Sequence, residues 1–469
     1  MCCAYMIRMA DFAVLYTAMA EFAPQLRDPL SRGDIRRTVR AFQSVTRATE
    51  AQLDQFWLRA YRAGNQLGIG VCEVASDLLT LDAFTFRGMT RTLINTMQYS
   101  AGALAVMAPN VEGRATLQEF QNKLLVFNLF ENVDTVLGLS PETDLNQLIA
   151  RTAVLDGFDA VWAMEGIGHY YTENVWETKG RPHGLLRAVE VPAKSLVALH
   201  AGMGLSLANR MLSPVGETAS SLRSALQRFV SLCRDNSREA DLGASYEALG
   251  LVARNLYPHL IARIDGDLSG DGEHLADYFW HGVGRAIYFA PTNYVPLSSS
   301  SVRIVEMTQR EPPHQAGQSN ALAGAIWALF LVNLREPEVI ENFLIHCEQV
   351  KFDEDAFANG VSSAAIIWGD STDDTALLEA LCRYQPCAGV FERWNNLVRV
   401  PCLDALKGDG SIGERFRYRC ASRQAALAVT ENSGAGITQE IDRIVSQIVH
   451  TLSHNKAQKE PQKGTKEFF

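Results

Sequence analysis

A short cluster of small residues returns along this chain, each time inside a stretch whose apolar residues follow helical spacing. The first small residues of six copies stand at positions 166, 202, 248, 282, 321 and 360, so the steps are 36, 46, 34, 39 and 39 residues. A weaker copy lies upstream at 67–70 (LGIG). The six copies are 165–168 (EGIG), 201–204 (AGMG), 247–250 (EALG), 281–284 (HGVG), 320–323 (NALA) and 359–362 (NGVS).

Glycine within a helix costs about 1 kcal/mol relative to alanine. Small residues that recur at the same position of successive helices are expected where another helix crosses closely. Only a hydrogen or a methyl group in place of a larger side chain lets two backbones approach. A helical hairpin with its turns takes about 35 to 47 residues. We therefore expect an all-α fold built as a degenerate helical-hairpin repeat array, either an α-solenoid or a toroid-like arrangement. The alternative is coincidence, since glycine and alanine are common residues.

The rest of the chain also shows helical spacing, and strand-like alternation is scarce. Ser140-Pro141 and Ser213-Pro214 each have the form of an N-cap followed by proline at the first helical position. We expect long helices near 6–24, 33–64, 67–81, 84–107 and 112–133, and a loop at 291–301. The expected organisation is an N-terminal helical section at 1–139, a helical repeat region at 140–400, C-terminal helices at 401–455 and a disordered tail at 456–469.

Composition narrows the class of protein. The 469 residues carry a formal charge of −10, which makes binding to a phosphate backbone unfavourable, so we expect no nucleic-acid partner. Nine cysteines without a CxxC pair predict reduced thiols in a cytoplasmic protein. The most apolar stretch, 321–334, is too short for a membrane span, which needs about 20 residues, and is expected to be a buried helix.

The sequence gives little support for three kinds of site that are recognised by motifs: a dinucleotide site, a serine-nucleophile site and a metal site. The Gly-x-Gly pieces lack the third glycine and the preceding strand of a dinucleotide site, and there is no Gly-x-Ser-x-Gly elbow. Glu311 and His314 form the chain's Glu-x-x-His, but they enclose two prolines and cannot lie inside a regular helix. We expect no metal site and no cofactor. A helical metalloenzyme built on Glu165 and His169 stays as a weaker alternative.

The residue before the first small residue is polar in five of the six copies. These positions share one helical phase, so their side chains could converge on one surface or channel. Residues four positions further on lie on the same helix face. The candidate catalytic residues are Glu165, His169, His281 and Arg285, and the candidate substrate-binding residues are Glu247, Tyr170, Tyr288, Asn320 and Asn359.

Two interpretations of these residues stay open. They could form a pocket in which carboxylates and histidines transfer protons and an arginine binds an anion. They could equally be buried polar groups that satisfy backbone exposed at glycine-rich crossings. Tryptophans near the clusters are expected to fill the core rather than to enclose a polyene.

The same clusters carry a resemblance to a known family. The segments 164–168 (MEGIG), 199–204 (LHAGMG), 279–289 (FWHGVGRAIYF) and 357–360 (FANG) resemble the UnbL-type family of enediyne biosynthesis over about residues 155–395. The block at 320–325 departs from it, with alanine where the family tends to have glycine. The resemblance implies a helical protein of polyketide assembly. It carries over no catalytic residue, because that family has no assigned reaction.

The resulting hypothesis is an accessory protein of polyketide or enediyne-like biosynthesis. It would bind an apolar polyene intermediate in a helical channel lined by Glu165, His169, Glu247, His281, Arg285 and Tyr288, and either shield that chain or help to cyclise it. The alternative is a non-catalytic helical-repeat scaffold for protein partners. Whether the chain is an enzyme stays open.

Overall fold

The computed structural model describes residues 62–64, 67–68, 70–71, 86–108, 110–141, 143–215, 219–268, 275–294, 300–372, 374 and 376–407. The chain divides into two compact units, Met1–Asn65 and Gln66–Phe469, and every helix below belongs to the second. The helices expected at 6–24, 33–64 and 67–81 and the C-terminal section and tail lie outside the described residues, apart from a few positions at 62–71 and the segment 401–407.

Every regular element within the described residues is helical, which confirms the all-α class. The expected helices at 84–107 and 112–133 are α4 and α5. The long helices are α4 (Phe86–Met107), α5 (Val111–Glu131), α8 (Gly157–Lys179), α9 (Leu196–Leu212), α10 (Ala219–Asn236), α11 (Leu242–Leu256), α13 (Leu275–Tyr288), α15 (Ser300–Arg310), α16 (Gln315–Val332), α17 (Pro337–His346) and α18 (Glu354–Ser371).

Shorter elements connect them. These are α6 (Val133–Val136), α7 (Leu145–Arg151), α12 (Ile261–Leu268), α14 (Pro291–Tyr294), α19 (Ala376–Arg383), α20 (Phe391–Trp394), α21 (Val400–Lys407), the π-helical turn η8 (Asn395–Arg399) and the 3₁₀ turns η3 (Thr152–Val154), η4 (Ala193–Ser195), η5 (Glu239–Asp241), η6 (Pro258–Leu260) and η7 (Ala388–Val390).

Three local predictions about helix ends were wrong. The helix after Ser140-Pro141 begins only at Leu145, because the Asp144 carboxylate caps it by accepting from the Gln147 backbone N–H at 3.1 Å. The pair at 213–214 forms a turn that ends α9 instead of starting a helix. The expected loop at 291–301 contains α14 at its beginning and the first residues of α15 at its end.

Helix α16 is the apolar stretch expected to be buried. Every side chain from Asn320 to Val332 is buried, so the helix lies inside the protein on all sides. Among the described helices none is both long and apolar enough to cross a bilayer.

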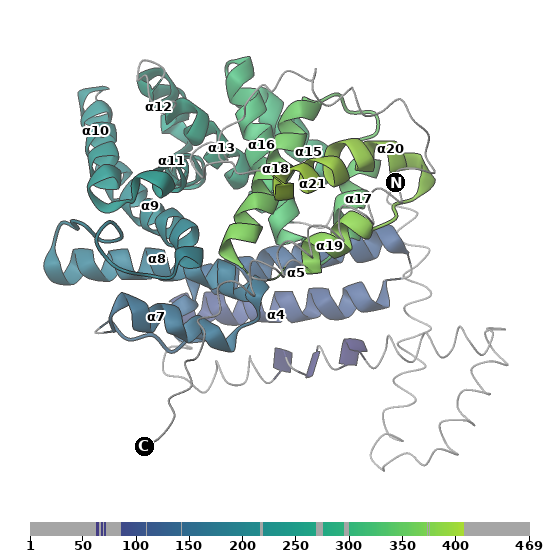
Figure 1. Ribbon diagram of the computed structural model, residues 1–469, viewed down its shortest axis with the longest axis horizontal. Helices are drawn as coiled ribbons and strands as arrows, with labels where there is room; N and C mark the ends of the chain where they lie inside the picture. Colours follow the sequence, from purple (N-terminus) through teal and green to yellow (C-terminus); the bar gives the residue numbers. More distant parts are fainter. Residues whose placement is uncertain are drawn as a thin grey trace, which may run out of the picture. The chain divides into compact units, whose positions relative to one another are not determined.

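Six helices pack in chain order. Helix α8 packs on α9, α9 on α11, α11 on α13, α13 on α16 and α16 on α18. Three of the helices between them pack against members of this series: α10 against α9 and α11, α12 against α11 and α13, and α15 against α13 and α16. Figure 1 shows α9, α11, α13, α16 and α18 following one another, with α8 and the pair α4 and α5 below them in that view.

Glycines lie where these six helices cross. A β-carbon at Gly202 of α9 would overlap the carbonyl oxygen of Glu165 in α8, and one at Gly168 of α8 would overlap that of Leu199 in α9. The same reciprocal pairing joins α11 to α13 and α13 to α16. The reason expected for the glycines therefore holds: at each crossing one backbone rests on another, leaving no room for a side chain.

The fifth cluster was aligned wrongly. In α16 the glycine at the crossing with α13 is Gly324, which rests on the carbonyl of His281, and the next crossing uses the carbonyl of Ala323 under Gly360 of α18. The residue that corresponds to Ala321 of the sequence alignment is thus Gly324, three positions later.

Candidate functional site

Three polar side chains occupy the same position relative to the points where the helix backbones cross. Glu165, Glu247 and His281 each precede a small residue, and each contributes its carbonyl oxygen to the glycine of the next helix: Gly202, Gly282 and Gly324. A side chain leaves the helix at a fixed angle from its own carbonyl. Helices that cross in the same way therefore direct these side chains to the same interior.

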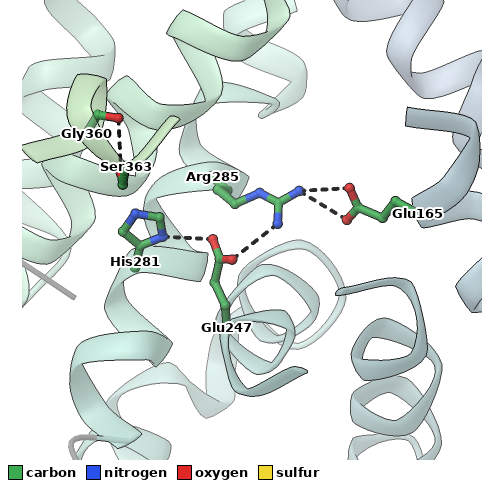
Figure 2. A network of polar contacts seen from close by, with 6 residues as sticks. All are labelled: Glu165, Glu247, His281, Arg285, Gly360 and Ser363. Carbon is green, nitrogen blue, oxygen red and sulfur yellow. Dashed lines mark hydrogen bonds and ion pairs between the residues drawn. The ribbon is translucent and has the colours of Figure 1, made fainter. Parts of the chain in front are cut away.

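Arg285, one turn after His281 in α13, joins the two carboxylates, and His281 contacts one of them directly. The His281 Nδ1 lies 2.8 Å from Glu247 Oε1, and Arg285 Nη1 donates to Glu247 Oε2 at 3.4 Å. Arg285 Nη2 donates to both oxygens of Glu165, at 3.1 and 3.2 Å. Figure 2 shows this chain of contacts from His281 through Glu247 and Arg285 to Glu165, which joins α13, α11 and α8. We call these four residues the polar network.

The two carboxylates differ in how deeply they are buried and in the direction of their pKa shifts. Both side chains of the Glu247–His281 pair are fully buried, whereas Glu165 keeps 10% of its side-chain surface exposed. Burial alone raises the pKa of a carboxyl, and for Glu165 it outweighs the lowering by Arg285, so its pKa lies above the ordinary value. For Glu247 the opposing effect of Arg285 and His281 is larger, and its pKa lies below the ordinary value.

The network's charges fix where protons sit. Because the ionised Glu247 carboxylate can only accept, the His281 Nδ1 carries the hydrogen of their bond. Burial lowers the pKa of Arg285 less than its two carboxylate neighbours raise it, so it stays a cation. Two carboxylates beside one guanidinium leave one excess negative charge, which is costly to bury. A proton on Glu165, whose pKa is raised, neutralises the network.

A cavity opens beside the exposed end of the network. The space that centres of water molecules could occupy in it is about 20 Å³, whereas one water needs about 10 to 15 Å³. Its polar lining residues are Glu165, Arg285 and Ser371, and two indole rings, those of Trp162 and Trp327, face it. The remaining lining is aliphatic: Val161, Val197, Ala198, Ala201, Leu331 and Ile367.

The indole of Trp327 completes the surroundings of Arg285. The guanidinium carbon lies 4.5 Å from the centre of a Trp327 ring, a cation–π contact, and the Trp162 ring meets Trp327 edge to face at 6.5 Å. Both tryptophans were predicted to fill the core, and both are buried in it, but their place at the cavity was not predicted. Trp162 could have been found, since it lies three residues before Glu165 on the same helix face. Nothing local to the sequence marks Trp327.

The structure brings together four of the nine predicted site residues and separates others. His169 lies one turn after Glu165 but faces α5, with its ring 5.4 Å from that of Phe130. Tyr170 is partly buried against the hydrophobic core. Tyr288 belongs to a different group, where its hydroxyl accepts from Asn333 Nδ2 at 2.8 Å and Lys123 Nζ lies 3.9 Å from its ring centre.

The two asparagines also lie elsewhere. Asn320 Nδ2 donates to Asp277 Oδ1 at 3.2 Å, because the misaligned cluster puts this residue one turn before the crossing. Asn359 is half-buried on α18 and is not among the residues that line the cavity. The position equivalent to Glu165 in α9 is Ala201, and its methyl group does line the cavity.

The network can hold and orient a proton, and nothing in the described helices gathers ligands for a metal. Within those helices no three His, Cys, Asp or Glu side chains lie close enough to share an ion. Glu311 and His314, the Glu-x-x-His of the sequence, contact Arg254 at 2.9 Å and Asp265 at 3.1 Å respectively. The chemistry available at the cavity is thus that of a carboxyl group held in apolar surroundings.

Comparison of the chain with protein-family models, with curated proteins and with solved structures finds no match.

Proposed function

We propose that this protein binds an apolar, unsaturated chain at the cavity and serves as an accessory protein of polyketide or enediyne-type biosynthesis. The observation that carries the proposal is the composition of the cavity wall. Two indoles and six aliphatic side chains surround the Glu165–Arg285 pair, and binding sites for small molecules combine an apolar lining with few polar groups in this way.

The Glu165 carboxyl gives the site a chemical capability. Its raised pKa favours the protonated form, and a protonated carboxyl in an apolar site can donate a hydrogen bond or a proton. Arg285 donates to both Glu247 and Glu165, and so holds the Glu165 carboxyl in position. Such a group could assist cyclisation of a bound polyene, and without proton transfer the same site would shield the chain from water.

Entry of a ligand requires side chains to move, because the cavity holds little more than one water as it stands. Val161 of α8 and Ser371 of α18 are half-buried, unlike most of the lining. We place the entrance there, where the first and last of the six packed helices come together.

We also infer that the six helices form a closed, toroid-like array of helical hairpins. Their packing in chain order supports a repeat. Contacts between helices distant in the series support closure: Phe158 of α8 lies 6.2 Å from Trp368 of α18, measured between ring centres, and α18 also contacts α9. An open solenoid has contacts only between neighbouring units.

A conjugated tetraene fatty acid tests the binding proposal, because its fluorescence increases in an apolar site and its absorption overlaps tryptophan emission. We expect the wild-type protein to bind it and Ala201→Leu, which fills the cavity, to bind at least about tenfold more weakly. The matched control is Ala188→Leu on an exposed turn, which should bind like wild type. Ser371→Leu at the entrance provides a second variant should Ala201→Leu fold poorly. Equal binding by all four proteins would refute the proposal.

A second candidate is a scaffold for protein partners, which the mutual bonding of the network favours. Glu165, Glu247 and Arg285 already bond to one another, as a purely structural network would. Under this hypothesis Glu165→Gln changes stability and leaves tetraene binding and any turnover unaffected. Under the first hypothesis Glu165→Gln retains binding but loses any cyclisation of a polyene substrate.

A further inference from the structure

Two buried cysteines lie in contact at the C-terminal end of the described chain. The sulfur atoms of Cys382, in α19, and Cys402, in α21, are 3.6 Å apart, and the exposed fractions of the two residues are 1% and 0%. Both are free thiols. A disulfide has its sulfurs about 2.05 Å apart, so small side-chain movements would bring them to bonding distance.

The surroundings favour a thiolate on one of the two sulfurs. The Arg399 Nε donates to the Cys382 carbonyl at 2.8 Å, and Arg383 follows Cys382 in the chain. The hydrogen bond between the two sulfurs, helped by these two arginines, holds the pKa of Cys382 below its ordinary value despite burial. The same hydrogen bond and burial raise the pKa of Cys402.

The other buried thiols differ from this pair. Burial raises the pKa of Cys233 well above its ordinary value, and raises that of Cys347 to about 12. Neither has a cysteine neighbour among its described contacts. The backbone beside the pair is also unusual, because Arg399 ends the π-helical turn η8 directly before α21. Single π-helical turns are rare and frequently mark functional sites.

We propose that Cys382 and Cys402 are a thiol–disulfide switch, oxidised by hydroperoxides such as hydrogen peroxide, which cross-links α19 to α21. The Cys382 thiolate attacks the peroxide, whose O–O bond breaks, giving a sulfenic acid and, after protonation of the leaving hydroxide, water. The Cys402 sulfur then attacks the sulfenic sulfur, forming the S–S bond and releasing a second water. In total two thiols and one hydrogen peroxide give one disulfide and two waters.

The helices that carry the two cysteines show how a peroxide could reach them and what their oxidation would change. Helix α19 is eight residues long and its first residue is exposed, so local opening of this short helix admits a small peroxide. The Ser362 hydroxyl of α18 donates to the Pro401 carbonyl at 3.1 Å, which links α21 to a helix that also lines the cavity. Oxidation would thus fix α21 to α19 next to the helix that closes the six-helix series.

Peptide mapping without reduction tests the switch independently of any ligand. The full-length protein is treated with hydrogen peroxide, remaining thiols are alkylated, and the digest is analysed by mass spectrometry. We expect a peptide pair joined through Cys382 and Cys402, two hydrogen atoms lighter than the separate peptides, that disappears after dithiothreitol. Cys387→Ser, which removes a nearby exposed thiol, should give the same cross-link.

Cys382→Ser and Cys402→Ser should each abolish the cross-link, and the wild-type map is decisive even where a variant folds poorly. Two results would overturn the switch. One is full alkylation of Cys382 and Cys402 under peroxide that oxidises Cys387. The other is a cross-link that joins Cys382 to Cys387 instead of to Cys402.

Discussion

Glu165 and Glu247 are the same side chain in two environments, and their pKa values shift in opposite directions. Glu247 lies between His281 and Arg285 and keeps its charge, whereas Glu165 has Arg285 alone and faces an apolar cavity. A pair of carboxyls with separated pKa values is a frequent arrangement where one group must hold a proton and the other a charge. Among the described residues, this pair is the strongest candidate for chemistry.

The opposite shifts predict opposite pH dependences of stability. The folded protein raises the pKa of Glu165, so the stability it adds is present below the unfolded pKa and is lost as pH rises through the folded pKa. Glutamine cannot ionise. The melting temperature of wild type minus that of Glu165→Gln should therefore fall as pH rises above the unfolded pKa of about 4.3.

Glu247→Gln is the matched comparison. The folded protein lowers the pKa of Glu247, so the stability it adds is present above the unfolded pKa and is lost as pH falls through the folded pKa. The difference between wild type and this variant should therefore rise with pH up to the unfolded pKa of about 4.3 and stay level above it. Parallel curves for the two variants would contradict the assignment of protonated and ionised carboxyls.

At the scale of the helix, glycines set the distance between neighbours. The crossings of α11, α13 and α16 bring carbonyl oxygens directly against glycine α-carbons. Such contacts also allow a weak Cα–H···O hydrogen bond. A helix that carries these glycines loses intrinsic helical stability and gains close packing along its length.

Two glycine-to-alanine changes should have opposite signs. A β-carbon at Gly282 would overlap the Glu247 carbonyl, whereas one at Gly369, on the exposed end of α18, meets nothing within 4 Å. Gly282→Ala should destabilise the protein by about 1 to 3 kcal/mol or more through overpacking. Gly369→Ala should stabilise it by up to about 1 kcal/mol through helix propensity. Urea unfolding measures both, and equal effects would mean that the crossing tolerates a methyl group.

At the scale of the whole six-helix series, aromatic contacts join its two ends. Phe158 of α8 is 3% exposed, and its ring lies near those of Trp162 and Trp368 and under the Arg335 guanidinium. Phe158 and Trp368 are 210 positions apart in the sequence. Loss of this contact should therefore loosen elements at both ends of the series.

Phe158→Ala should cost about 3 to 5 kcal/mol of unfolding free energy by leaving a cavity. Amide hydrogen exchange should become faster in α18 as well as in α8, with less change in α11. The exposed control Leu256→Ala, at a residue 57% exposed, should change stability by no more than about 0.5 kcal/mol. Faster exchange in α8 alone would argue against closure of the series.

The sequence by itself determined the helical class, the positions of α4, α5 and α16 and the existence of close crossings. These depend on spacing along one helix, and a period of 3.6 residues is visible in a single chain. It also indicated Glu165, Glu247 and His281, because one phase recurs before each small residue. Helix ends at 140–145 and 213 were missed, since several polar residues compete for the capping position.

Only the tertiary structure decided which of these side chains meet. Glu165 and Arg285 are 120 residues apart, and their contact depends on how three helices cross, which no local pattern encodes. The same holds for Trp327, for the true register of α16 at Gly324 and for the Cys382–Cys402 pair. Helical spacing fixes the face on which a residue lies, whereas its partner is fixed by the packing of elements distant in sequence.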